Sequence, residues 1–150
     1  MANTQAVVTD FKVKSLNGIH ALSTSVVRAA TTADTFKAAL YFATATINAS
    51  STVYTVTGEA TGTNYAAGGI TAPAWVAPAS TGTTAFTTLS ASLVYTNVTI
   101  TAFDAVLIYN STQGNASVCV HTFGSQTITA GTFTLTMPTN DATSGQLRLA

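Results

Sequence analysis

The sequence predicts an all-β fold, a single-domain β-sandwich or jelly-roll-like barrel of about eight strands with a short N-terminal helix. Three observations predict this class. The apolar runs are short and rich in β-branched and aromatic residues, they are bounded by Gly, Asn, Ser and Thr, and apolar residues alternate with polar ones from residue 34 onward. We therefore expect a helical arm over residues 1–22 and a β-sandwich domain over residues 23–150.

The N-terminal segment is where helical spacing occurs. Apolar or small residues recur three or four positions apart at Val8, Phe11, Ser15, Ile19 and Leu22. Thr4 is a suitable N-cap, and Asn17-Gly18 is typical of a helix end near residue 16. Six of the ten charged side chains lie between residues 10 and 37. This segment is therefore either a helix that covers one end of a sheet or an arm that docks on a partner.

Two strands and two irregular stretches are expected next. Strands are predicted at residues 36–42 and at residues 52–57, where β-branched and aromatic residues dominate. The glycine-rich residues 58–69 match no phosphate-binding spacing and open no helix, so they predict a long ordered loop anchored by Tyr65. Residues 71–88 hold two of the three prolines and predict an edge segment, in which Trp75 either fills the core or is exposed as a contact residue.

The central strand is expected within residues 101–110. Residues 106–109 are apolar without a break, and Asn110-Ser111-Thr112 ends the run, which is typical of a strand covered on both faces. Shorter strands are predicted around it at residues 93–95, 98–100, 118–123, 132–137 and 147–150. In residues 132–137 the alternation predicts Phe133, Leu135 and Met137 inward, with the threonines outward.

The low charge of the chain excludes several classes of protein. Only 7% of residues are charged and the formal net charge is zero. We therefore expect no basic surface of the kind that binds nucleic acid. The mean hydropathy is +0.36, but Gly, Pro, Thr and Asn interrupt every apolar stretch, and we expect no membrane span. The N-terminus lacks the pattern of a signal peptide. A neutral Thr-, Ala- and Gly-rich surface favours association with copies of the protein or with a larger structure.

Residues that perform chemistry are scarce. Cys119 and His121 share one strand face, but positions two apart lie about 6.6 Å apart along a strand, too far for a direct bond without bending. Two histidines and one cysteine do not reach metal-ligand spacing, and Asp104 is expected to accept backbone N–H groups where the central strand begins. We interpret the four Asn-X-Ser/Thr sequons as chance matches in a Ser- and Thr-rich chain. The sequence therefore predicts no catalytic residue, metal or cofactor.

Several blocks of sequence are familiar in their order. They are Phe11-Lys12, Leu16-Asn17-Gly18-Ile19-His20, Ala33-Asp34-Thr35-Phe36-Lys37, Leu40-Tyr41, Tyr54, Gly58-Glu59, Gly62, Tyr65-Ala66-Ala67-Gly68-Gly69, Ala102-Phe103-Asp104-Ala105-Val106-Leu107-Ile108-Tyr109-Asn110, Phe123-Gly124, Gly131-Thr132-Phe133-Thr134-Leu135 and Leu147-Arg148-Leu149-Ala150. Together they resemble a family of small structural proteins of tailed bacteriophages. The chain departs from that family at Ser125, where a second glycine is usual, near His121, where an acidic residue is usual, and near Phe103-Asp104, where a small or basic pair is common.

The resemblance implies a virion component without enzymatic activity, made in the cytoplasm of the host bacterium. The first expectation is a capsid decoration (cement) protein on the capsid surface, with the major capsid protein and copies of itself as partners in a homo-oligomer such as a trimer. A tail, neck or fibre component and a glycan-binding β-sandwich that uses Trp75 and Tyr65 are the alternatives. The candidate interface residues are Val8, Phe11, Lys12, Lys14, Tyr65 and Trp75.

Overall fold

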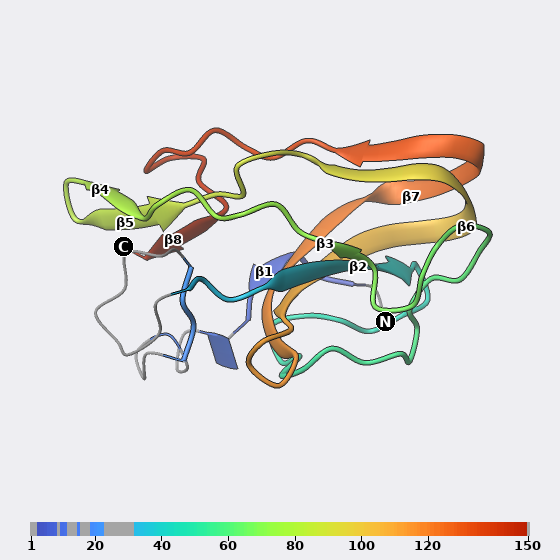
Figure 1. Cartoon of the computed structure of the whole chain (residues 1–150), viewed down its shortest axis with the longest axis horizontal. Helices are drawn as coiled ribbons and strands as arrows, with labels where there is room; N and C mark the ends of the chain where they lie inside the picture. Colours follow the sequence, from blue (N-terminus) through green and yellow to red (C-terminus); the bar gives the residue numbers. More distant parts are fainter. Residues whose placement is uncertain (1–2, 9, 12–14, 16–18, 23–31, 150) are drawn as a thin grey trace.

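The protein is all-β, with two antiparallel sheets (Figure 1). The computed structural model describes residues 3–8, 10–11, 15, 19–22 and 32–149. Its strands are β1 (Ala6–Val7), β2 (Phe36–Phe42), β3 (Ile70–Thr71), β4 (Ala79–Thr81), β5 (Thr84–Thr87), β6 (Leu93–Asn110), β7 (Ala116–Leu135) and β8 (Leu147–Leu149). The larger sheet has the order β1-β7-β6-β2-β3, and the smaller has the order β4-β5-β8. This confirms the all-β class and is consistent with a β-sandwich.

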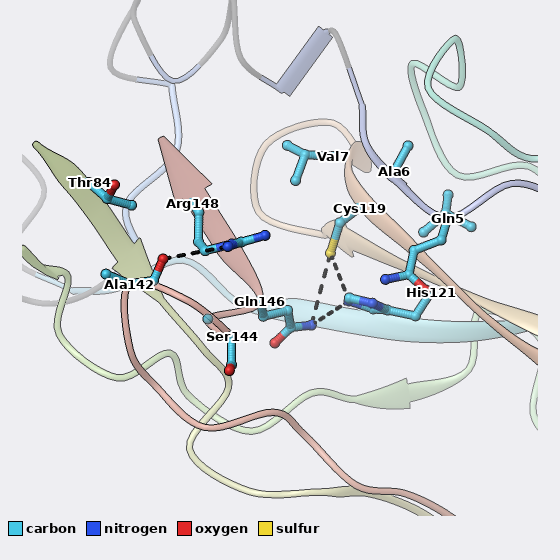
Figure 2. Close-up of a pocket in the computed structure, with 12 residues that line it drawn as sticks. Gln5, Ala6, Val7, Thr84, Cys119, His121, Ala142, Ser144, Gln146 and Arg148 are labelled. Carbon is cyan, nitrogen blue, oxygen red and sulfur yellow. Dashed lines mark hydrogen bonds between the residues drawn. The ribbon is translucent and has the colours of Figure 1, made fainter. Parts of the chain in front are cut away.

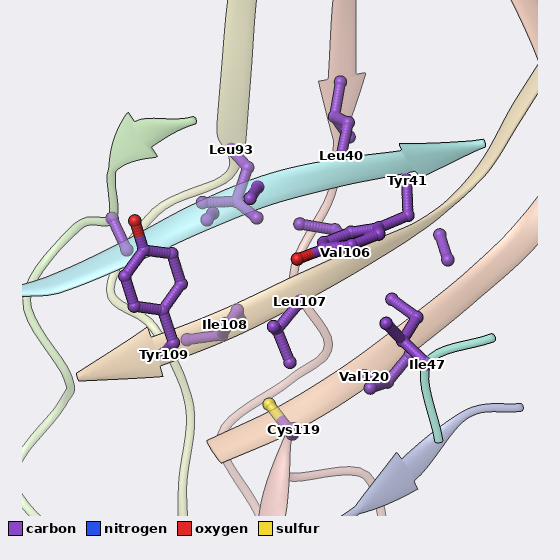
Figure 3. Packing of buried hydrophobic residues seen from close by; sticks show 14 of the residues in the cluster. Leu40, Tyr41, Ile47, Leu93, Val106, Leu107, Ile108, Tyr109, Cys119 and Val120 are labelled. Carbon is purple, nitrogen blue, oxygen red and sulfur yellow. The ribbon is translucent and has the colours of Figure 1, made fainter. Parts of the chain in front are cut away.

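The central strand lies where the sequence predicted it. Residues 105–108 of β6 have no solvent exposure, and Tyr109 is 2% exposed. The strand runs between β2 and β7, as Figure 3 shows. Leu107 lies opposite Ala39 on one side and Val120 on the other. Fully burying each of its large aliphatic side chains stabilises the fold by about 1.5–3 kcal/mol. This part of β6 is therefore the centre of the core.

A single long hairpin, β6 and β7, takes the place of several short strands that the sequence predicted. The two strands stay paired from Leu93 and Leu135 to Asn110 and Ala116, with repeated shifts of register. Asn97, Ala102 and Ala130 have positive φ angles at these irregular positions. Bulges bend a strand without ending its pairing, and Figure 1 shows the hairpin curling back over itself at one end. The breaks that were expected between the strands at residues 93–95 and 98–100, and after residue 123, are therefore bends or an exposed stretch within β6 and β7.

The N-terminal segment differs from the helix that was expected to begin after Thr4. Ala6 and Val7 form β1, which pairs with Val120 and Cys119 of β7. Asn3 is buried, and its side-chain amide donates to the backbone oxygen of Phe42 and to Asp104. Strand pairing at the sheet edge thus overrides the helical spacing in this part. No helical element is found among the described residues, where helical backbone occurs only at Asp10, Phe11 and Ser15.

Other expectations have mixed outcomes. The predicted strand at residues 52–57 is wrong: that stretch forms only an isolated bridge between Val53 and Ala116, and Val56 is 69% exposed. The C-terminal strand is confirmed as β8. The alternation at residues 132–137 is confirmed, with Phe133 buried and the threonines exposed. Among the described residues, no helix is long and apolar enough to cross a membrane.

Candidate functional site

One pocket brings together a thiol and an imidazole, the side chains of Cys119 and His121. It has a volume of about 490 Å³ and lies between β1, the first half of β7 and the segment that leads into β8 (Figure 2). Cys119 and His121 come from β7, and Gln146 comes from the residue before β8. The pocket is the best candidate for a site because these three polar side chains converge there from distant parts of the sequence.

The hydrogen bonds around Gln146 determine the state of His121. The backbone N–H of Leu89 donates to Gln146 Oε1 at 3.1 Å, so the amide nitrogen of Gln146 faces the pocket. That nitrogen lies 2.8 Å from His121 Nε2. Because an amide nitrogen can only donate, His121 Nε2 accepts and the ring proton is on Nδ1. Cys119 Sγ lies 3.4 Å from the same His121 nitrogen. The two side chains are therefore in contact, although their separation along the strand was expected to keep them apart.

Burial keeps both members of the pair uncharged at neutral pH. It raises the pKa of the Cys119 thiol to about 12, although the hydrogen bond from Gln146 acts in the opposite direction. Burial also lowers the pKa of His121 to about 4. A reactive cysteine needs a thiolate, which an imidazolium or another cation stabilises. Here the imidazole is neutral, and the Arg148 guanidinium, which also lines the pocket, donates to the backbone oxygen of Thr143. The geometry therefore brings a thiol and an imidazole together as a neutral pair.

The rim of this pocket is a turn that holds its own charged side chains. Asp141 Oδ1 accepts hydrogen bonds from the backbone N–H groups of Thr143 and Ser144, and these bonds lower the pKa of Asp141. The guanidinium of Arg148 donates to the backbone oxygen of Thr143. Among the residues that the structure describes, no group of three His, Cys, Asp or Glu side chains could hold a metal ion.

A second polar cluster surrounds Glu59, which is 6% exposed. Its carboxylate accepts hydrogen bonds from the hydroxyls of Tyr54 and Tyr65 and from the backbone N–H of Gly68. The Tyr65 hydroxyl also accepts from the backbone N–H of Leu40 in β2 at 2.8 Å. The carboxylate therefore joins distant points of the loop that precedes β3, and the Tyr65 hydroxyl links them to β2.

Four of the five tyrosines make hydroxyl hydrogen bonds that attach this loop, and the ring of the fifth, Tyr95, stacks on Tyr65. Tyr109 donates to the backbone oxygen of Gly68, Tyr41 to that of Thr55 and Tyr95 to that of Ala38. Burial is the largest cause that raises the pKa values of these phenols, and the negative charge of Glu59 adds to it. The hydroxyls therefore stay protonated and act as donors, which is a structural role.

The loop also depends on glycine where it rejoins the sheet. Gly69 has a φ of 71°, and a Cβ there would lie 1.8 Å from the backbone oxygen of Ala38. Only glycine allows so close an approach together with a positive φ. Tyr65 is thus the packing anchor that the sequence predicted, and the glycine-rich stretch is an ordered cover on β2.

The candidate interface residues lie in different environments. Val8 and Phe11 are buried in the core, and Trp75 is 6% exposed and packs edge-on against Phe36. Tyr65 is partly buried and fully engaged by Glu59 and Leu40. Lys12 and Lys14 lie outside the described residues. The core interpretation of Trp75 is confirmed, and the described members of this set do not form one exposed patch.

The sequence patterns did not predict the roles of three buried polar residues. Asn3 and Gln146 each hold separate segments together, and Glu59 joins three points of one loop. Glu59 could have been singled out, because it is the only glutamate and stands among Tyr54, Gly58 and Tyr65. Nothing in the local pattern distinguishes Asn3 or Gln146. Asp104, expected to accept backbone N–H groups, accepts the side-chain amide of Asn3 at 2.6 Å.

Both clusters are thus built from neutral or internally paired groups that connect strands and loops. Comparison with known proteins adds no relative: neither a protein-family model nor a curated protein nor a solved structure gives a significant match to this chain.

Proposed function

We propose that the protein is a non-enzymatic structural component of a tailed-bacteriophage virion, and specifically a capsid decoration protein that binds the assembled major capsid shell. The observation that supports the proposal is that the buried polar side chains serve to hold the fold together. Glu59, Gln146 and the tyrosines hold the fold together, and the Cys119–His121 pair is uncharged. The described residues thus offer a rigid, weakly charged scaffold and no activated nucleophile.

The blocks that resemble phage structural proteins correspond to the parts that maintain this scaffold. Residues 54–69 form the loop attached through Glu59, and residues 102–110 contain the buried half of β6. Residues 131–135 end β7, and residues 147–149 form β8. Blocks that preserve architecture are what a protein acting through its shape needs, because a partner surface is presented only by a rigid framework.

Binding to the shell would stabilise the particle by mass action. A ligand that binds the assembled shell and not its free subunits shifts the equilibrium towards the shell. A surface with little charge adds no long-range repulsion between neighbouring copies on the lattice. The capsid surface is therefore the proposed location, with the major capsid protein as partner.

Cryo-EM of the virion, together with quantitative mass spectrometry, tests this proposal. A decoration protein is expected as density on the outer shell in hundreds of copies, and particles that lack it should release their genome at a lower temperature. Density confined to the tail, neck or fibres, with a small fixed copy number, would contradict capsid decoration and support the tail alternative.

Glycan binding receives less support from the geometry. Sugars are commonly bound on exposed aromatic rings that present a flat face, whereas Trp75 is buried against Phe36. The Tyr65 hydroxyl is occupied by Glu59 and Leu40. A glycan array would separate the two functions: binding above background would favour the glycan-binding alternative.

A further inference from the structure

The outer edge of β7 changes from covered to open along its length. At the start of the strand, the backbone N–H of Ser117 donates to Thr52, and the backbone oxygen of Val118 accepts from Val8. Cys119 and Val120 then pair with β1. Beyond this point the strand pairings of β7 are with β6 alone. Among the described residues, no other backbone group bonds to residues 122–135.

This open edge carries no charged residue and no proline. An exposed strand edge is a template for pairing with another chain, and proteins normally guard it with charged side chains, proline or very short strands. Residues 122–135 contain no Lys, Arg, Asp, Glu or Pro. By contrast, the strands β3 and β4 at the margins of the two sheets have two and three residues. Figure 1 shows the last part of β7 along the upper margin of the molecule, with no strand beyond it.

We propose that a second copy of this chain pairs with this edge, antiparallel and about a two-fold axis, through residues 132–135 of β7. This stretch is regular, since Phe133, Thr134 and Leu135 face Tyr95, Val94 and Leu93 without a shift of register. The bulges lie earlier in the strand, near Ala130. The straight end of β7 is therefore the part whose geometry suits continued pairing.

The chemistry of the edge matches a second copy. Two-fold pairing places each side chain near a side chain of the same patch, so any charge would face a like charge. Here β7 has no charged residue to repel its copy. Thr132 and Thr134 are exposed, and threonine hydroxyls both donate and accept, so they are complementary to themselves. The zero net charge of the chain removes long-range repulsion as well.

This inference deepens the proposed function by naming the surface through which copies associate. Charge variants of the full chain test it, with oligomeric state measured by sedimentation and light scattering. The wild type should be a dimer at micromolar concentration. The variants T132K/T134K and T132E/T134E should each weaken the dimer at least about tenfold, because like charges then meet at the two-fold axis.

Mixing the two variants should restore dimers of one lysine chain with one glutamate chain, detected by native mass spectrometry. Thr57→Lys, an exposed position on the loop, is the matched control and should remain dimeric. Circular dichroism establishes that each variant is folded. A monomeric wild type, a trimer, or variants that dimerise as the wild type does would overturn the inference. Because these measurements use the isolated protein, their outcome is independent of where the protein lies on a virion.

Discussion

Glu59 shows how one buried carboxylate can organise a long loop. It accepts three hydrogen bonds, from the hydroxyls of Tyr54 and Tyr65 and from the backbone N–H of Gly68. Removing an acceptor while its donors stay buried costs the desolvation of those donors. The stability of the loop therefore rests on a residue that contributes little to hydrophobic packing.

Substitution of Glu59 tests this role. Glu59→Ala should lower the free energy of unfolding by about 2–4 kcal/mol, because several donors lose their acceptor at once. Glu59→Gln should cost less, since its amide oxygen still accepts. Urea denaturation measures both variants, and the exposed Thr57→Ala should change stability by less than about 0.5 kcal/mol. An effect of Glu59→Ala as small as that of Thr57→Ala would show that the tyrosines hold the loop without the carboxylate.

His121 makes stability depend on pH in a defined direction. Its folded-state pKa of about 4 lies below the ordinary value of 6.5 because burial disfavours the imidazolium. Protonation therefore favours the unfolded chain, so the contribution is complete above pH 6.5 and is lost as the pH falls towards 4. Protonation also converts His121 Nε2 into a donor facing the donor nitrogen of Gln146. The expected loss is at most about 3 kcal/mol, reduced by the partial exposure of the ring.

Denaturation curves between pH 4 and 7 check this prediction. The variant His121→Gln should show a shallower decline in the free energy of unfolding over this range, since the titrating group is gone. Carboxylates titrate in both proteins, so the difference between the two curves isolates His121. Parallel curves would mean that His121 titrates with an ordinary pKa in the folded protein.

At the scale of elements, the bent β6–β7 hairpin decides the architecture. Residues such as Val106 and Leu107 could be assigned from sequence because an unbroken apolar run has one simple interpretation. The bends could not, because Ala102 and Ala130 adopt positive φ angles that alanine rarely shows. Similarly, residues 52–57 have strong β-propensity but form a loop. Hydrogen bonds that involve Tyr41, Tyr54 and Glu59 hold this stretch in place of regular pairing with a neighbouring strand.

Ala102 is therefore a site where the backbone can be relieved. Its φ is 53°, a conformation that costs a non-glycine residue about 1 kcal/mol and glycine almost nothing. Ala102→Gly should raise the free energy of unfolding by up to about 1 kcal/mol. The matched change Ala79→Gly, in the exposed strand β4, should lower it by a few tenths to about 1 kcal/mol. Thermal denaturation of the two variants checks the signs, and a loss at Ala102 would contradict the idea that the bend is strained.

At the scale of the whole molecule, the sequence predicted local features but not which distant residues meet in the fold. Low charge, short apolar runs and the central strand all followed from local pattern. The contact of Cys119 and His121 with Gln146 could not be predicted in this way. Gln146 is distant from them in sequence, and the orientation of its amide depends on a hydrogen bond from Leu89. In the same way, β1 joins β7 across more than a hundred residues, and this pairing overrode a helical spacing at Ala6 and Val7.

Association through β7 has a consequence for the stability of the whole protein. If two copies pair through this edge, the folded dimer is favoured by mass action, and the midpoint of thermal unfolding should rise with protein concentration. T132K/T134K should show a smaller rise over the same range, because its dimer is weaker. The T57K control should behave as the wild type does. Differential scanning calorimetry over a hundredfold range of concentration measures this. A wild-type midpoint that is constant over that range would show that the folded protein does not associate through the edge of β7.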